Sequence, residues 1–487
     1  MRQNGHFRFN YFHLIAFLLW TLLSCKGTDP DAYKISSLEA QIENSLVSNI
    51  QFKGDTKETF TLANRMAELN IPGVSIAVAK DGELIWSKAY GFADIEENKP
   101  MNTETMLLCC SVSKIITAAR VIQLVEEGEI KLQEDVNTYL TSWKVPENEF
   151  TVEEKVTIER LLEHRSGING RGGTSFDIKG LIPTTIELLN GVNTETAPVK
   201  VIAIPGGQYE YSANNYLILQ QMIEDIDDMS FTSSLKQNVL DPLGMTSSTF
   251  ENPLPSQFLN KAASAYTDDG EKVEGKYKVP TDLAAAGLWS TPSDLLKYIT
   301  QIQNTLQREK DEFITFEMVN QMRLNERNTE HLGMIAEEYT FGHPGGCTGF
   351  NAIVLAWKKQ PYAIAILVNG DSPVLRREIA YTFSQVFELP SDHEPKVYEA
   401  YDMNKDHLEK YTGHYKIIEE GLGDIQIKIK NNKLQYDFIK MKTPVVLTPI
   451  SDSVFIDKDG YKHSFVITNG VVTKYMGWGF MESIKFE

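Results

Sequence analysis

Hydrophobic and small residues alternate along the segment 73–94 as they do in two β-strands joined by a tight turn. β-Branched residues occupy every second position from Val74 to Val78, and Asp81-Gly82 is a typical turn dipeptide. The segment 350–371 repeats the pattern, with two apolar runs on either side of residues 358–361. The sequence therefore predicts two β-hairpins.

The region between these hairpins has a mostly helical pattern. From 111 to 128 apolar residues recur every three or four positions, and Gly128 stands where a helix commonly ends. A second helix is predicted at about 216–225. Because strands lie on both sides of a helical middle, the simplest fold is α/β. Its antiparallel sheet is built from the N- and C-terminal parts and flanked by helices, with an inserted helical domain.

The pattern changes after residue 390. Residues 391–403 are polar and contain a proline, which is typical of a linker. From residue 404 onward apolar and polar residues alternate as in β-structure, for example from Ile425 to Ile429. We therefore predict a main domain over residues 41–390 and a small all-β domain over residues 404–487.

The first residues are typical of an export signal. Arginines precede an apolar run, 11–23, that is too short for a comfortable membrane span. The Leu-Leu-Ser-Cys sequence that ends at Cys25 resembles a bacterial lipobox, in which the cysteine is diacylated. We predict a signal peptide over residues 1–24, a lipid anchor on Cys25 and a tether over residues 25–40. The protein would then lie in the periplasm or on the cell surface, bound to a membrane; plain secretion is the alternative.

Composition and charge exclude some classes of protein. The 42% of hydrophobic residues and 23% of charged residues are those of a globular protein. The net charge is −19, and no cluster of lysines and arginines offers a face for nucleic acid. Zinc and nucleotide motifs of the C-x-x-C, H-E-x-x-H and P-loop types are missing, so we expect neither a metal nor a cofactor.

Three cysteines remain after the predicted cleavage site, apart from Cys25 itself. Cys109 and Cys110 are adjacent, and Cys347 lies far along the chain. Because adjacent cysteines rarely bridge one another and the count is odd, we expect buried free thiols.

The candidate chemistry begins with Ser111 and Lys114, a Ser-x-x-Lys motif at the start of the predicted helix. A serine there can present its hydroxyl in a cleft, and a lysine one turn later can reach it as a general base. The ordinary alternative is a helix-capping serine followed by a surface lysine. A second match, Ser233 to Lys236, lies in an amphipathic stretch where both side chains can face water.

Seven segments between residues 64 and 387 follow one another in a fixed order. They are GVSIAVAKDGELIWSKAYGFAD, SVSKIITA, VTIERLLEHRSGI, PGGQYEYSANNYLILQQMIED, DPLGMTSSTFE, LAAAGLWSTPSDL and FGHPGGCTGFNAIV. Together they resemble the serine β-lactamase and penicillin-binding-protein superfamily, in particular its branch of class C β-lactamases, D-Ala-D-Ala carboxypeptidases and esterases. The last domain resembles the small lipocalin-like β-domains, or β-barrels, often attached to these hydrolases.

The resemblance implies roles for individual residues. Ser111 would be the acylated nucleophile and Lys114 its hydrogen-bonded partner. Tyr211, in YSAN, matches the tyrosine that shares a proton with the lysine and delivers it to the leaving group. The backbone N–H groups of Ser111 and Gly346 would form the oxyanion hole. His343, with Pro344 and Gly345, matches the family's third element, which is Lys-Thr-Gly or His-x-Gly.

The resemblance assigns substrate binding to Ala213 and Gly345. The chain departs from the family pattern at Ala213 itself and at Pro344, the neighbour of Gly345. Ala213 stands where the family usually has the asparagine of Tyr-x-Asn, and the side chains of Asn214 and Asn215 would point elsewhere. Pro344 replaces a hydroxyl residue that often contacts the substrate carboxylate. Both departures favour hydrolysis of an ester, amide or peptide.

The implied function is that of an exported serine hydrolase acting on a small-molecule or peptide substrate. It would cleave a β-lactam, a D-amino peptide or a small ester through an acyl-enzyme on Ser111. The alternative is a penicillin- or peptidoglycan-binding or sensor protein on the same scaffold, with little turnover. A cysteine hydrolase using Cys110 and His164 is a weaker possibility, because the position of His164 in the family is structural. The oligomeric state has no signal in the sequence.

Overall fold

An eight-stranded sheet forms the centre of the main domain. The computed structural model describes residues 30–486, apart from 55, 57, 171–174, 325, 327–328, 419–423, 439–443 and 478–480. In spatial order the strands are β11 (Thr329–His331), β12 (Met334–Ala336), β13 (Thr340–Cys347), β14 (Phe350–Trp357), β15 (Tyr362–Val368), β4 (Gly73–Lys80), β5 (Glu83–Asp94) and β6 (Lys99–Pro100). Neighbouring strands are antiparallel. Both predicted hairpins, β4–β5 and β14–β15, are confirmed, and the pairing of β15 with β4 joins the two ends of the domain.

The two faces of the sheet differ in side-chain size. On one face Ile76, Ile353 and Ile364 pack against α2 (Pro30–Asn44) and α13 (Val374–Val386). On the other face small residues such as Ala77 and Ala365 let α11 (Pro292–Arg308) approach closely. Because the strands are covered on both faces, β14 is buried along its whole length.

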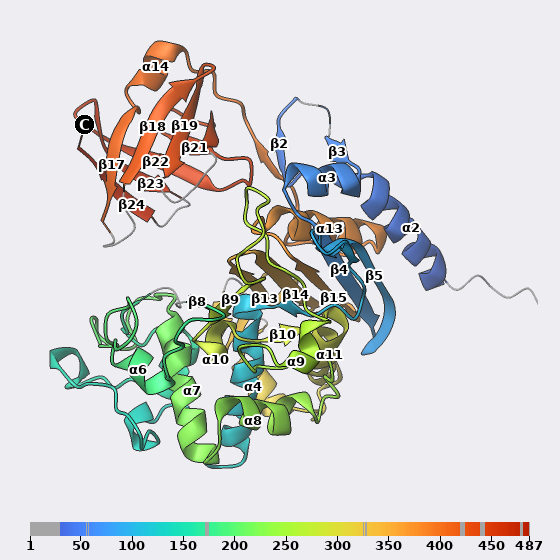
Figure 1. Cartoon of the computed structure of the whole chain (residues 1–487), viewed down its shortest axis with the longest axis vertical. Coiled ribbons are helices and arrows are strands. Elements are labelled where there is room, and N and C mark those ends of the chain that lie inside the picture. Colours follow the sequence, from blue (N-terminus) through green and yellow to red (C-terminus); the bar gives the residue numbers. More distant parts are fainter. Residues whose placement is uncertain are drawn as a thin grey trace, which may run out of the picture.

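Most of the other helices of the main domain gather below the second face of the sheet, around α4 (Figure 1). They are α4 (Ser113–Glu126), α5 (Ile158–Leu162), α6 (Thr185–Leu189), α7 (Ala213–Asp227), α8 (Phe231–Leu235), α9 (Ser256–Leu259), α10 (Leu283–Ala286) and α12 (Phe316–Gln321). The helix predicted from residue 111 begins with a 3-10 turn, η1 (Cys110–Val112), and continues as α4. The second predicted helix is α7, which is longer at both ends than predicted.

The C-terminal region is a closed, antiparallel eight-stranded barrel preceded by α14 (Lys405–Glu409). Its strands are β17 (Gly413–Ile417), β18 (Asp424–Lys430), β19 (Lys433–Phe438), β20 (Val445–Pro449), β21 (Val454–Ile456), β22 (Lys462–Thr468), β23 (Val471–Gly477) and β24 (Met481–Lys485). Aromatic side chains, among them Tyr415 and Tyr475, fill the interior. The predicted α/β fold, an antiparallel sheet flanked by helices with a small all-β region at the C-terminal end, is thus confirmed.

The predicted linker is not entirely irregular. Within it β16 (Lys396–Tyr398) pairs in parallel with β2 (Ile50–Phe52), which ties the N-terminal part of the chain to the segment that leads to the barrel. Short strands of the main domain complete the inventory: β1 (Leu46–Val47), β3 (Thr59–Phe60), β7 (Leu107–Leu108), β8 (Ser175–Asp177), β9 (Lys278–Pro280) and β10 (Trp289–Ser290), with helix α3 (Leu62–Glu68). The domain boundaries at 390 and 404 stay a prediction.

The predicted signal peptide and the anchor residue Cys25 lie outside the described residues. Of the predicted tether, residues 30–40 belong to α2, where Leu38 is fully buried. None of the helices in the described part of the chain is long and apolar enough to cross a membrane.

Candidate active site

Ser111 lies in a cavity of about 290 Å³ between the sheet and the helical region. It is half-buried in the short turn η1, directly before α4. Lys114, Tyr211 and Gly346 line the same cavity, together with Ala213. The structure therefore brings together residues that stand far apart in the sequence.

The Ser111 hydroxyl oxygen accepts two hydrogen bonds. Lys114 Nζ donates to it over 3.3 Å and the Tyr211 hydroxyl over 2.9 Å. Lys114 is only 1% exposed, and its amine also donates to the carbonyl oxygen of Ala285 over 3.1 Å. A lysine is rarely buried in this way without partners. The spatial relation predicted for the three side chains is present; their catalytic roles stay a prediction.

The two asparagines after Ala213 are directed away from the cavity, as predicted. Asn214 Nδ2 donates to the carbonyl oxygen of Asn169 over 2.7 Å. Asn215 Oδ1 accepts from the Ser166 hydroxyl over 2.6 Å, and its Nδ2 lies 3.1 Å from His164 Nδ1. Ala213 itself begins α7 and lines the cavity, so its methyl group stands there in place of an amide.

Gly345 brings β13 into contact with the turn that carries Ser111. A β-carbon at this position would overlap the carbonyl oxygen of Cys109 and lie 3.2 Å from the backbone nitrogen of Ser111. A larger residue would force the two backbones apart. The neighbouring Gly346 is exposed in the cavity beside Ser111, which is compatible with the predicted oxyanion hole.

A disulfide joins Cys110 to Cys347, so the expectation of free thiols is wrong for these two residues. Cys109 is free and buried, as expected. The error has a simple physical reason. Adjacent cysteines cannot easily bridge each other, but one of them can bridge a third cysteine that the fold brings close. Here the Cα atoms of Cys110 and Cys347 are 5.7 Å apart.

His343 is placed differently from the other predicted site residues. It is buried, is not among the described residues that line the cavity, and its Nε2 lies 3.8 Å from Glu330 Oε1. The Glu330 side chain is 5% exposed; its Oε1 lies 3.3 Å from His164 Nε2, and the Tyr209 hydroxyl donates to its Oε2. The His164 ring packs on the Tyr211 ring with 4.4 Å between centroids, so Glu330 and two imidazoles stand behind Tyr211.

The electrostatics of this group are consistent with a charged Glu330 and a neutral His164. Burial alone would raise the pKa of Glu330, but contacts with His164 and His343 hold it well below its ordinary value. Burial lowers the pKa of His164, and the nearby Glu330 offsets only part of this shift. The backbone N–H of Ser212 donates to His164 Nδ1, which leaves Nε2–H to face the carboxylate. Sequence reasoning missed Glu330, because nothing local distinguishes it from other acidic residues.

Replacing Glu330 by glutamine is expected to lower the free energy of unfolding by about 1–3 kcal/mol at neutral pH, because a buried charged acceptor is lost. A carboxyl group whose pKa is lower in the folded than in the unfolded protein stabilises the fold. This contribution is fully present above the ordinary pKa of 4.5, which applies to the unfolded chain, and it is lost as the pH falls toward the lower pKa of the folded protein. Chemical denaturation should show a difference between wild type and variant that shrinks below a pH of about 4.5. The exposed Glu129→Gln is the control and should be nearly neutral; a difference independent of pH would contradict the assignment.

One acid in the cavity was also missed by sequence reasoning. Asp282 is buried at the start of α10 and lines the cavity with Ser111 and Lys114. Burial raises its pKa to about 6, although the charge of Lys114 acts in the opposite direction. The site therefore contains a carboxyl group that titrates in the mildly acidic range.

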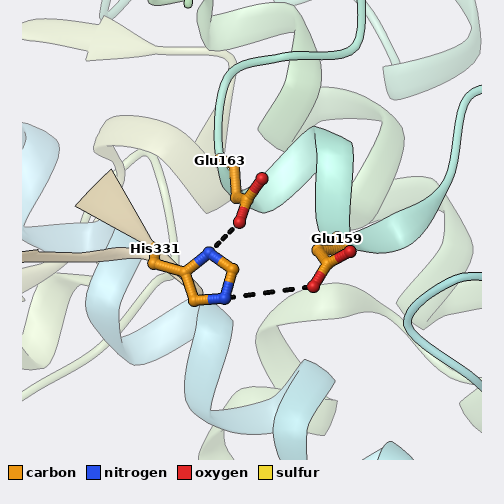
Figure 2. A group of neighbouring side chains, drawn as sticks. All are labelled: Glu159, Glu163 and His331. Atoms are coloured by element: carbon orange, nitrogen blue, oxygen red, sulfur yellow. Dashed lines mark ion pairs between the residues drawn. The ribbon is translucent and has the colours of Figure 1, made fainter. Parts of the chain in front are cut away.

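A second group of titratable side chains lies near α5: Glu159, Glu163 and His331. Figure 2 shows the His331 ring between the two carboxylates: Nδ1 contacts Glu163, and Nε2 lies 3.9 Å from Glu159. A metal ion would be bound through one ring nitrogen, with donors converging on the same side. One donor atom of each residue does lie within 4.8 Å of the others. The contacts that the structure shows are those of one imidazole with two carboxylates, and they join α5 to β11.

Comparison with known proteins agrees with this fold. The Beta-lactamase family model matches residues 61–385. Protein flp of Staphylococcus aureus (strain MRSA252) is 24% identical over 336 residues, which cover 65% of this chain and 63% of that protein. The teichoic acid D-alanine hydrolase of S. aureus is 24% identical over 278 residues, covering 57% of this chain and 66% of that protein. The chain thus spans about 63% of the length of protein flp.

A solved structure extends the similarity of fold toward the C-terminal region. The octameric penicillin-binding protein homologue from Pyrococcus abyssi superimposes with a TM-score of 0.58 at 22% identity, covering 87% of this chain and 98% of that one. At this identity the similarity concerns the fold alone. The family model matches well over half of the chain and includes Ser111, Lys114, Tyr211 and His343. The chain belongs to the beta-lactamase family.

Proposed function

We propose that this protein is an exported serine hydrolase that cleaves an ester or an amide through an acyl-enzyme on Ser111. The observation that carries the proposal is the pair of hydrogen bonds from Lys114 and Tyr211 to the Ser111 hydroxyl oxygen inside a cavity. A serine hydroxyl is a weak nucleophile, and neighbouring groups that accept its proton activate it. Hydrolases among the relatives, such as the teichoic acid D-alanine hydrolase, support this reading.

The chemistry follows from the positions of the side chains. Lys114 and Tyr211 act as a pair: the member that is deprotonated accepts the single proton of Ser111 as the serine oxygen attacks the carbonyl carbon of the substrate. Negative charge then develops on the carbonyl oxygen, where the backbone N–H groups of Ser111 and Gly346 would receive it. Tyr211 returns the proton to the leaving group, and water removes the acyl group in a second cycle of the same kind.

The side chains that line the cavity limit the class of substrate that it can bind. Ala213 offers no side-chain amide to a substrate, and Asn214 and Asn215 are occupied elsewhere. We therefore favour a small ester or a D-amino amide or peptide over a β-lactam. The teichoic acid D-alanine hydrolase, to which the chain is similar, supports a D-amino acyl group.

The test uses the soluble chain, residues 27–487, incubated with a p-nitrophenyl ester and separately with a penicillin. We expect a burst of nitrophenol followed by steady turnover of the ester, and a slow or minor reaction with the penicillin. Intact-mass spectrometry would show whether an adduct forms. No adduct and no turnover with either compound would overturn the proposal.

The alternative is a binding or sensor protein that is acylated without turnover. The alanine at position 213 is the observation that favours it, because the missing amide removes a contact to the substrate carbonyl that the family resemblance implies. Such a protein would give a stable adduct on Ser111 in the mass spectrum and a burst without a steady phase.

Export and anchoring are part of the proposal. Their support is the apolar run 11–23 followed by Ser24-Cys25, and the disulfide between Cys110 and Cys347, since disulfides persist mainly in oxidising compartments. Replacing Cys25 by serine is expected to move the protein from the membrane fraction of cells to a soluble fraction, because the acyl chains that hold it are lost. Fractionation and immunoblotting measure this. An unchanged membrane fraction would contradict the lipid anchor, and the variant Cys109→Ser serves as the control.

A further inference from the structure

The disulfide occupies a special place relative to the predicted oxyanion hole. Cys110 directly precedes Ser111, and Cys347 directly follows Gly346. The two residues whose N–H groups are predicted to receive the oxyanion are therefore each bonded to one half of the same disulfide. Their relative position depends on how firmly η1 and β13 are held together.

η1 and β13 each form further contacts with other parts of the fold. The backbone N–H of Cys109 donates to the carbonyl oxygen of Leu288 over 2.7 Å. β13 forms its ladders with β12 and β14. η1 and β13 also pack directly against each other, and within this contact lie the close approach at Gly345 and the disulfide. The close approach limits how near the two backbones come, whereas the disulfide limits how far apart they move.

Cys110 also has an unusual backbone conformation. Its φ angle is +51°, in the left-handed region that residues with a side chain seldom adopt. Such a conformation persists only where the surroundings hold it in place. Because it lies one residue before Ser111, a relaxation at Cys110 would turn the N–H and the hydroxyl of Ser111.

We propose that the Cys110–Cys347 disulfide is a positioning element of the oxyanion hole, and that its reduction lowers the catalytic rate while the fold and substrate binding remain. The inference rests on the proposed hydrolase function of Ser111. Reduction should lower kcat rather than raise KM, because negative charge on the carbonyl oxygen develops only in the transition state, where the oxyanion hole acts.

The structure also gives the route of reduction. Cys110 is fully buried, whereas Cys347 is half-buried and lines the cavity that contains Ser111. A thiolate of a small dithiol attacks the Cys347 sulfur, and Cys110 leaves as a thiolate that takes up a proton. The second thiol of the reagent then breaks the mixed disulfide and releases Cys347. Two electrons and two protons pass from the dithiol to the protein. An acyl group on Ser111 should shield Cys347 and slow this reaction.

The experiment compares oxidised and reduced wild-type protein. Dithiothreitol is added, the gain of two hydrogen atoms is verified by intact mass, and the reagent is removed before ester turnover is measured. We expect kcat to fall roughly tenfold to a hundredfold with KM nearly unchanged, since losing one oxyanion donor costs about 10²–10³ in kcat. Far-UV circular dichroism should show an intact fold, and reoxidation should restore kcat.

Two variants complete the test. Cys110→Ala/Cys347→Ala should have the low kcat of the reduced protein and no longer respond to dithiothreitol. Cys109→Ala, which removes the free buried thiol, should lose the same fraction of kcat on reduction as the wild type. An unchanged kcat in reduced protein that turns over the ester normally overturns this inference alone. Absence of turnover in the oxidised protein overturns the proposed hydrolase function and this inference with it.

Discussion

Ser111→Ala is expected to abolish turnover, with a fall in kcat of at least about 10⁴-fold, because no other group can form the acyl-enzyme. The variant should still fold, since Ser111 is half-buried and the change removes one oxygen atom. Its effect is measured by ester hydrolysis and by labelling with a fluorophosphonate probe. Both signals should disappear together.

The second Ser-x-x-Lys motif supplies a matched control. Ser233 is exposed on α8, and Lys236 forms an ion pair with Asp241 on the surface, 2.6 Å between Nζ and Oδ1. Ser233→Ala should leave turnover and labelling unchanged. If Ser111→Ala were still labelled at the wild-type rate, Ser111 would not be the nucleophile, and the proposed mechanism would fail.

Lys114→Met is expected to lower the rate of acylation by about 10²- to 10⁴-fold, the usual contribution of a general base. Methionine keeps much of the length and apolar surface of the lysine, so the buried position remains filled while the amine is lost. The change removes the hydrogen bonds from Nζ to Ser111 and to the carbonyl oxygen of Ala285. Stopped-flow measurement of the nitrophenol burst reports acylation directly.

For this second substitution the control is Lys236→Met at the surface, which should leave the burst rate unchanged. A thermal denaturation scan of both variants separates loss of the base from loss of the fold. A burst in Lys114→Met within about threefold of the wild-type rate would assign the role of base to another group, with Tyr211 as the first candidate.

The secondary structure could be predicted from the sequence where side chains alternate or recur regularly. The hairpins β4–β5 and β14–β15, the helix α4 and the all-β character of the C-terminal region all follow from such patterns. The pairing of β15 with β4 has no local signal; the sequence predicted only that strands of the N- and C-terminal parts share one sheet, as the simplest fold. β16 was missed because a short, polar edge strand has the composition of a linker.

The spatial arrangement that the family motifs imply is present in part, and the catalytic roles of these residues stay a prediction. Ser111, Lys114 and Tyr211 are in contact, whereas His343 faces Glu330 instead of lining the cavity. Glu330 and the disulfide partner of Cys110 were not foreseen, because both depend on long-range packing. Motif spacing predicts which side chains meet the substrate, but it does not report the buried groups that support them.

The position of β4 in the sheet has a consequence for synthesis of the chain on the ribosome. β4 and β5 are translated early, yet the partner of β4 on its other side is β15, with Val74 opposite Val368. Until β15 has been synthesised, the β4–β5 hairpin has one unpaired edge and an uncovered apolar surface. Exposed strand edges of this kind favour aggregation, and sheets closed by distant segments form slowly. Nascent chains that end before residue 362 are therefore expected to depend on chaperones.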